Sequence, residues 1–166
     1  KEVVFPKDLD ELLYQLKNDD VIGRMAAAGE IVGFKDDPKV AAGLAASAQG
    51  DPFWAVRRTA VESLAKIPSS RRPAVLKTAC QDRDSAVRTA AVLALGDLKD
   101  RGLVEFYKEM FRKDTSTRVR AEALRALGKT GESAVVPFLR QAASVPSHQN
   151  MVRRAAESAI KQLENK

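Results

Sequence analysis

Apolar residues recur at helical spacing along almost the whole chain. Between residues 85 and 96 one stripe is formed by Val87, Ala90, Ala91, Ala94 and Leu95. Residues three and four apart lie on the same face of an α-helix, so the stripe predicts a helix with one buried face. A later stretch repeats the pattern with Val119, Ala123, Leu124 and Leu127. We expect Gly96 and Gly128 to end these helices, because glycine readily adopts the left-handed conformation found there.

A similar segment of sequence, which we call the phrase, occurs five times, and each copy contains an arginine at the same position. The arginines are Arg24, Arg57, Arg88, Arg120 and Arg153, at successive spacings of 33, 31, 32 and 33 residues. A near-constant period of this length is the mark of a repeat protein built from stacked units. The repeat therefore covers almost the whole chain.

A second, shorter helix is expected between consecutive phrases. The apolar spacing places these helices at residues 9–17, 38–48, 71–80, 102–111 and 133–143. Pro38 and Pro73 lie near helix starts, where the missing N–H costs nothing. Pro137 lies further in, and predicts either a later start or a kink in that helix.

Together the two helices form one unit, and the chain contains five of them. We expect the units at about residues 8–34, 38–67, 71–97, 101–128 and 132–164. One unit cannot bury its apolar stripe alone, so neighbours must stack into a continuous core. The predicted fold is all-α, a right-handed α-solenoid (superhelix) of five helix pairs spanning residues 8–166. Residues 1–7, with the short run Glu2–Phe5, are expected to be an extension or a strand of an upstream domain.

Composition agrees with this fold and limits the function. Hydrophobic residues are 45% and aromatic residues only 5%, an Ala-rich set that suits close helix packing. The single Cys80 excludes an intramolecular disulfide, and no apolar run approaches the roughly 20 residues that span a bilayer. The net charge of +6 divides into −3 over residues 1–50 and +9 over the remainder. The basic part either favours an acidic partner or is a solvated helical surface.

The phrases resemble the HEAT-repeat family, in its short form of about thirty residues. The matching features are an Asp before the second helix, then Val-Arg, then an Ala/Leu-rich helix that often ends in Leu-Gly. The first unit departs from the pattern, with Gly23 in place of Val. The last departs too, with Ser147 in place of Asp. Terminal repeats are commonly atypical, so both are still counted.

A narrower resemblance covers roughly the first 70 residues. The run KEVVFPKDLDELLYQLKNDDVIGRMAAAGEI, followed by DPFWAVR, is similar to the C-terminal helical domain of bacterial M1-family zinc aminopeptidases. This resemblance implies that Lys1 is a boundary inside a larger enzyme. It also implies that zinc belongs to the missing catalytic part, because the His-Glu-x-x-His motif needs two histidines and this chain has only His148. No catalytic residue and no cofactor is therefore expected in this chain.

The repeated charged residues have two possible roles. Asp51, Asp82 and Asp114 each stand six residues before an arginine of the phrase. We expect these aspartates to cap the following helix, and each arginine to reach a neighbouring unit's aspartate or turn carbonyls. The alternative is a row of arginines on the concave face that grips phosphates or carboxylates.

Other residues permit similar alternatives. Phe53 and Trp54 form either an exposed binding anchor or a staple that fixes a helix start. Cys80 is expected to be buried, and His148 to lie in a solvated loop. The doubled basic pairs Arg71–Arg72 and Arg153–Arg154 are interpreted as surface, with contact to an acidic partner as the alternative.

Three functions follow from these observations. The first is a non-catalytic module that packs against the other domains of a zinc aminopeptidase. The second is a free-standing adaptor that binds a protein or peptide on its concave face. The third is a nucleic-acid binder, against which the scarcity of aromatic side chains argues. A phycobilin lyase role is supported only by repeat similarity. The sequence does not indicate an oligomeric state.

Overall fold

The computed structural model describes residues 7–165, and all its regular elements are helices. Contacts divide the chain into two compact units, Lys1–Ala79 and Cys80–Lys166. In each unit helices pair with their neighbours in sequence and the pairs stack, so the predicted all-α fold of HEAT-like helix pairs is confirmed. The run Glu2–Phe5 lies outside the described residues.

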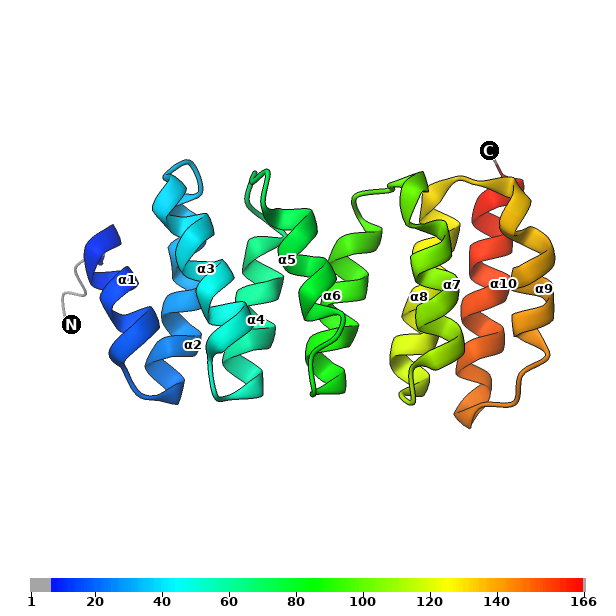
Figure 1. The fold of residues 1–166 in the computed structure, drawn as a ribbon, viewed down its shortest axis with the longest axis horizontal. Helices are drawn as coiled ribbons and strands as arrows, with labels where there is room; N and C mark the ends of the chain where they lie inside the picture. Colours follow the sequence, from blue (N-terminus) through cyan, green and yellow to red (C-terminus); the bar gives the residue numbers. More distant parts are fainter. Residues whose placement is uncertain (1–6, 166) are drawn as a thin grey trace, which may run out of the picture. The chain divides into compact units, whose positions relative to one another are not determined.

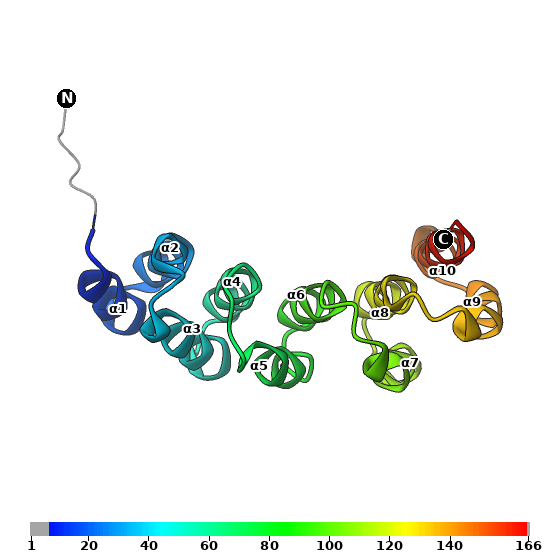
Figure 2. The ribbon, with the colours of Figure 1, turned by 90° about the horizontal axis from the view of Figure 1, so that it is seen from above.

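The N-terminal unit contains five α-helices within its described residues. They are α1 (Leu9–Asn18), α2 (Val21–Glu30), α3 (Pro38–Gly50), α4 (Trp54–Leu64) and α5 (Arg72–Ala79), with a 3₁₀ turn at Ile31–Phe34. Helix α1 packs on α2 and α3 on α4, and contacts between α1 and α3 and between α2 and α4 join the pairs. Figures 1 and 2 show the result, in which α1, α3 and α5 form one layer and α2 and α4 the other.

The C-terminal unit repeats this plan. Its helices are α6 (Ser85–Gly96), α7 (Val104–Lys113), α8 (Thr117–Thr130), α9 (Val136–Ala143) and α10 (Met151–Glu164), with 3₁₀ turns at Arg101–Leu103, Ser133–Val135 and His148–Asn150. Helix α8 packs against both α6 and α10, and these three form one layer of the unit. Helices α7 and α9 form the other layer, α7 against α8 and α9 against α10.

Helix starts follow local chemistry that the sequence displays. Side chains of Asp8, Asp20, Asp37, Asp84 and Ser116 accept hydrogen bonds from main-chain N–H groups in the first turn of the helix that follows. Each bond satisfies a donor that has no partner within the helix. Pro137 is the second residue of α9, which begins at Val136, so the predicted later start is confirmed and no kink is needed.

The prediction that Gly96 and Gly128 end their helices in a left-handed conformation holds only in part. Helix α6 ends at Gly96, but its cap Asp97 is right-handed, and α8 continues past Gly128 to end at the left-handed Gly131, with φ of 74°. A Cβ on Gly96 would lie 2.9 Å from the Ala126 Cβ, and one on Gly128 would lie 2.8 Å from the Ala159 Cα. These glycines are therefore contact points where α6 meets α8 and α8 meets α10, because no larger residue fits there.

Candidate functional site

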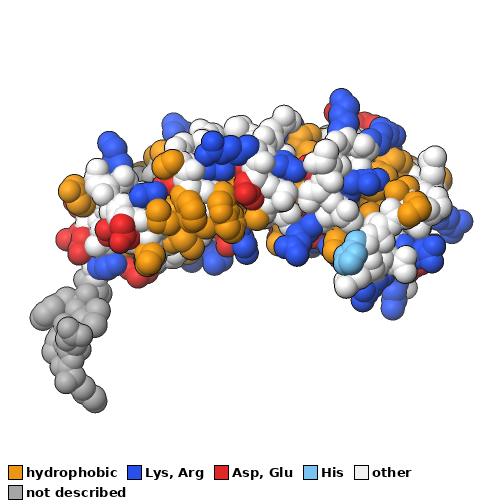
Figure 3. Space-filling model, turned by 90° about the horizontal axis from the view of Figure 1, so that it is seen from below, with side chains coloured by type: hydrophobic (Ala, Val, Ile, Leu, Met, Phe, Trp, Pro, Cys, Tyr) orange, Lys and Arg blue, Asp and Glu red, His pale blue; other side chains and the backbone are white. Residues whose placement is uncertain are grey.

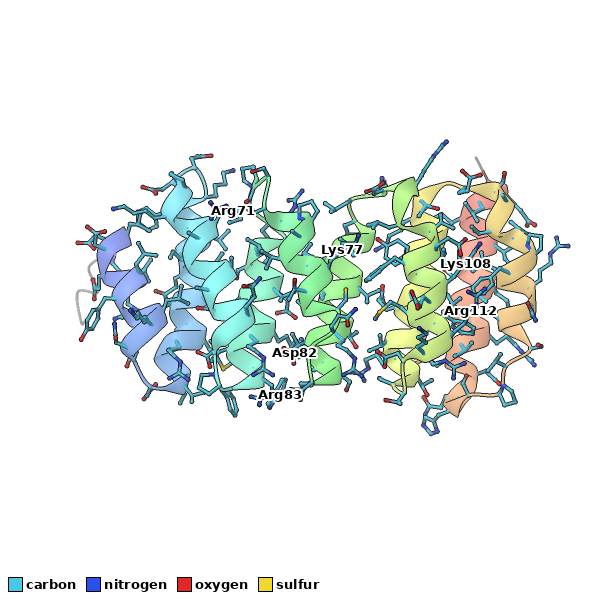
Figure 4. The ribbon with its side chains drawn as sticks, viewed as in Figure 1. Arg71, Lys77, Asp82, Arg83, Lys108 and Arg112 are labelled. Carbon is cyan, nitrogen blue, oxygen red and sulfur yellow. The ribbon has the colours of Figure 1, made fainter. Side chains whose placement is uncertain are left out.

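The repeated arginines connect one helix pair to the next. Arg88, on α6, donates from Nε to Asp114 Oδ2 at 2.7 Å and from Nη2 to Asp114 Oδ1 at 2.9 Å. Its third nitrogen, Nη1, donates to the main-chain carbonyls of Asp82 and Arg83, in the turn before α6 (Figure 4). One guanidinium thus holds the turn of its own pair and the aspartate of the next, and we call this arrangement an Arg–Asp rung.

An equivalent rung occurs in the N-terminal unit. Arg24, on α2, donates from Nε and Nη2 to the two carboxylate oxygens of Asp51, at 2.7 and 3.2 Å. Its Nη1 donates to the carbonyl of Asp19, in the turn before α2, at 2.8 Å. Arg57, on α4, is only 3% exposed, and its Nη1 donates to the carbonyls of Asp51 and Pro52. The arginine therefore contacts the turn of its own pair in each of these three copies.

The aspartates of the phrase do not cap helices as expected. Asp51, Asp82 and Asp114 each accept a hydrogen bond from the main-chain N–H two residues later, at 2.8 to 2.9 Å. This is an Asx turn, and in each copy the residue that donates is the N-cap of the helix that follows. The capping side chains themselves are the later residues Asp84 and Ser116 in α6 and α8. The phrase aspartate shapes the turn, which leaves its outer oxygen lone pairs available to an arginine.

The last two arginines differ from the others. Arg120 donates from Nε to the carbonyl of Phe111 at 2.9 Å, and its guanidinium lies 4.8 Å from the Phe111 ring centroid. Arg153 is exposed and makes one long bond, 3.4 Å, to the carbonyl of Ala143. No carboxylate from the described residues reaches either one. For Arg120 the sequence contains the reason, because Ser147 stands where the aspartate of the next copy would be.

Electrostatics strengthen the rungs. The Arg88 side chain is 14% exposed and the Asp114 side chain 7%, so the pair is largely shielded from water. The hydrogen bond that Arg88 donates to Asp114 raises the pKa of Arg88, and the bond that Arg24 donates to Asp51 raises the pKa of Arg24, despite the opposing effect of burial. Both arginines stay charged, and all three nitrogens of each guanidinium donate to a carboxylate or carbonyl oxygen within the protein.

The arginine and aspartate of each rung line an open groove. In the N-terminal unit, a groove of about 550 Å³ runs between α1 and α3, and is lined by Leu13, Lys17, Gly43, Arg24 and Asp51 among others. In the C-terminal unit, a groove of about 530 Å³ is lined by Cys80, Phe106, Glu109, Arg88 and Asp114 among others. In each groove the arginine and the aspartate already bond to each other. We therefore attribute the grooves to the stacking of helix pairs and not to a binding site.

Phe53 and Trp54 lie at the start of α4, partly exposed. Trp54 is the first residue of the helix and Phe53 its N-cap, without a side-chain capping bond. Both are 39% exposed, and their ring centroids lie 6.0 Å apart. Figure 3 shows hydrophobic side chains gathered over the N-terminal unit. Each ring is therefore partly buried against the N-terminal unit and partly exposed to solvent.

The groups that most often carry chemistry are buried or isolated. Cys80 is 1% exposed, as expected, and burial raises the pKa of its thiol to about 12. Burial likewise raises the pKa of Tyr107, whose hydroxyl has no hydrogen-bond partner among the described residues. His148 lies exposed in a 3₁₀ turn. Within residues 7–165 no group of three or more His, Cys, Asp or Glu could hold a metal ion, so these residues do not fit a zinc site.

Sequence reasoning missed a basic pocket on the α6–α8–α10 layer. It has a volume of about 450 Å³ and is lined by Thr89, Arg118, Glu122, Arg125, Gln149, Met151 and Arg154. Arg118, Glu122 and Arg125 are spaced at four and three residues on α8, opposite the apolar stripe that begins with Val119. That spacing was visible in the sequence. Their meeting with Arg154, on another helix, was not.

Comparison with known proteins identifies the class. HEAT repeats match residues 9–96 and 73–161, so the chain belongs to the HEAT-repeat family. A similar solved structure is the complex of CpcE and CpcF of phycocyanin lyase from Nostoc sp. PCC7120, with a TM-score of 0.73 and 20% sequence identity. The match covers 99% of this chain and 68% of that chain, and at this identity it shows the fold alone. No curated protein matches. In the described part of the chain, no helix is both long and apolar enough to cross a membrane.

Proposed function

We propose that this chain is a non-catalytic HEAT-repeat scaffold that binds a protein or peptide segment on the outward side of the layer formed by α6, α8 and α10. The observation that carries the proposal is the Arg–Asp rung. In each rung the repeated arginine and aspartate join helix pairs, and the arginine also bonds to a carbonyl of its own turn. What repeats is therefore the framework, and binding falls to side chains that vary between copies.

The outward residues of the C-terminal unit support this division of roles. Helix α8 buries its apolar stripe and turns Arg118 and Arg125 outward, while α6 exposes Leu93 at 45%. Stacked helices commonly present such a surface to extended partners. The similar solved structure is itself a complex of two proteins, which agrees with a binding role for this fold.

The test is selection of peptides from a displayed library by the whole chain, followed by mapping of the bound site by hydrogen exchange. We expect new amide protection in α6, α8 and α10, with little change in α7 and α9. Protection confined to α7 and α9, or no selected peptide, would refute the proposal. Aminoacyl-anilide substrates should remain intact in a parallel assay, and hydrolysis would contradict the non-catalytic assignment.

A second candidate is the C-terminal module of a zinc aminopeptidase. It rests on the sequence of residues 1–70, in particular the run from Leu12 to Met25 and the DPFWAVR segment that follows. In this case the partner surface would face other domains of the same chain, and zinc would belong to those domains. Reading the coding sequence upstream of Lys1 decides it. An open frame that encodes a His-Glu-x-x-His helix supports the candidate, and a nearby start codon removes it.

A further inference from the structure

The basic pocket collects like charges that the fold does not neutralise. Three arginines, Arg118, Arg125 and Arg154, line it against a single carboxylate, Glu122. Arg125 Nη1 donates to Glu122 Oε2 at 2.9 Å, so the charge of this carboxylate is paired with Arg125. Arg118 and Arg154 make no hydrogen bond or ion pair with any described residue. Guanidinium groups gathered in this way repel one another, so an anion in the pocket would relieve the repulsion.

The pocket is built on firm supports. The Glu122 side chain is 11% exposed and that of Arg125 42%, so the glutamate anchors the arginine from below while its guanidinium stays accessible. Arg118 and Arg125 are two turns apart on α8, and α8 packs directly on α10, which carries Arg154. The two helices therefore fix the backbone positions of the three arginines, and Glu122 also restrains the Arg125 side chain, which lowers the entropy lost on binding.

A helix N-terminus adds to the positive potential. Gln149 and Met151, at the start of the 14-residue α10, line the same pocket. The N-cap Asn150 makes no side-chain capping bond, and the neutral Ser147 Oγ accepts from the Val152 N–H in the first turn, so no carboxylate caps this end of the helix. The positive end of the helix dipole thus acts in the same direction as the arginines.

We propose that this pocket binds an acidic segment of a protein partner, with carboxylates that pair with Arg118, Arg154 and the outer edge of Arg125. The lining contains no aromatic ring on which a base could stack, which favours a peptide over single-stranded nucleic acid. Leu93 lies one turn beyond Thr89 on α6 and is 45% exposed, so an apolar side chain beside the acidic residues has a contact point. The proposal rests on the proposed scaffold function and specifies the chemistry of its partner.

The direct test is fluorescence anisotropy with the whole chain and labelled hexaglutamate, with hexaglutamine as the uncharged probe. We expect Arg118→Gln/Arg154→Gln to weaken hexaglutamate binding by about tenfold or more. The matched control is Arg112→Gln/Arg153→Gln, which removes the same charge from the same unit. Arg112 lies on α7, in the other layer (Figure 4), and Arg153 donates toward Ala143 instead of lining the pocket. The control should weaken binding by less than about twofold.

A second variant acts in the opposite direction. Glu122→Gln removes the carboxylate that competes with the ligand, so we expect hexaglutamate to bind about two- to fivefold more tightly. General loss of structure cannot produce tighter binding. An equal loss in both double variants, no measurable binding of hexaglutamate, or no gain from Glu122→Gln would overturn the proposal.

Further probes identify the source of the anion. Inorganic phosphate and a phosphoserine peptide should compete no better than hexaglutamate, and a single-stranded oligonucleotide should bind more weakly. Tighter oligonucleotide binding that is lost in Arg118→Gln/Arg154→Gln would overturn the assignment to a protein partner. If library peptides protect α6, α8 and α10 but ignore that variant, the scaffold function stands and the acidic-partner inference fails. If no peptide binds, both fail.

Discussion

Arg88 and Asp114 are 26 residues apart in sequence, and yet the arginine donates to both carboxylate oxygens of the aspartate, at 2.7 and 2.9 Å. The bond joins α6 to the turn before α8, so it connects neighbouring helix pairs. Bidentate arginine–carboxylate pairs are directional as well as strong, and this pair is mostly shielded from water. The rung therefore sets how one pair sits on the next within the unit.

Replacing Arg88 with alanine should lower the free energy of unfolding by about 2–3 kcal/mol, because it leaves a largely buried carboxylate without its partner. Urea unfolding followed by circular dichroism measures the effect. Arg140→Ala is the control, since Arg140 pairs with Glu164 at 3.5 Å and both side chains are more than half exposed. That change should stay within about 0.5 kcal/mol. Equal losses in the two variants would contradict a structural role for the rung.

Gly128→Ala should destabilise the chain although alanine is the better helix former. The added Cβ would lie 2.8 Å from both the Cα and the Cβ of Ala159, so α8 and α10 must move apart, at a cost of about 1–3 kcal/mol. The control is Gly29→Ala in α2, where nothing lies within 4 Å of the new Cβ. There the helix propensity of alanine should raise stability by about 0.5–1 kcal/mol. Thermal melting curves that shift in the same direction for both variants would refute the close-contact role of Gly128.

Tyr107→Phe should leave stability unchanged or raise it, by up to about 1 kcal/mol. Tyr107 is fully buried on α7, and its hydroxyl has no partner among the described residues. Removing an unsatisfied buried polar group eliminates its desolvation cost and keeps the ring packing. Differential scanning calorimetry of the two proteins decides the point. A clear loss of stability would show that the hydroxyl is hydrogen-bonded in solution.

Stability should fall at alkaline pH, partly through Cys80. Burial raises the pKa of this thiol from 9.0 to about 12, so the folded state holds the proton more tightly than the unfolded state. The stabilising effect is complete below pH 9.0 and is lost as pH rises toward 12. Urea unfolding at several values from pH 8 upward should therefore show a steeper loss for the native chain than for Cys80→Ala. Parallel curves would contradict the shift.

The period of the arginine phrase and the apolar stripes are local features, and these were readable from the sequence. A helix with a regular apolar stripe must bury it, and stripes that recur every 31 to 33 residues can do so only by stacking. The all-α repeat fold, the late start of α9 at Pro137 and the burial of Cys80 followed from this local chemistry.

The repeat predicted that an arginine reaches a neighbouring unit's aspartate, and Arg24–Asp51 and Arg88–Asp114 agree with this. Tertiary structure decided the other contacts, because their partners lie in different helices. Gly96 ends α6 as the sequence predicted and Gly128 does not end α8, but only the approach of Ala126 and Ala159 shows that both glycines are contact points. Asp114 resembled a helix cap, but its turn geometry directs it to Arg88. The meeting of three arginines in one pocket likewise depends on how α8 and α10 pack. Sequence spacing determines which face of its own helix a residue occupies, whereas helix packing determines what that face meets.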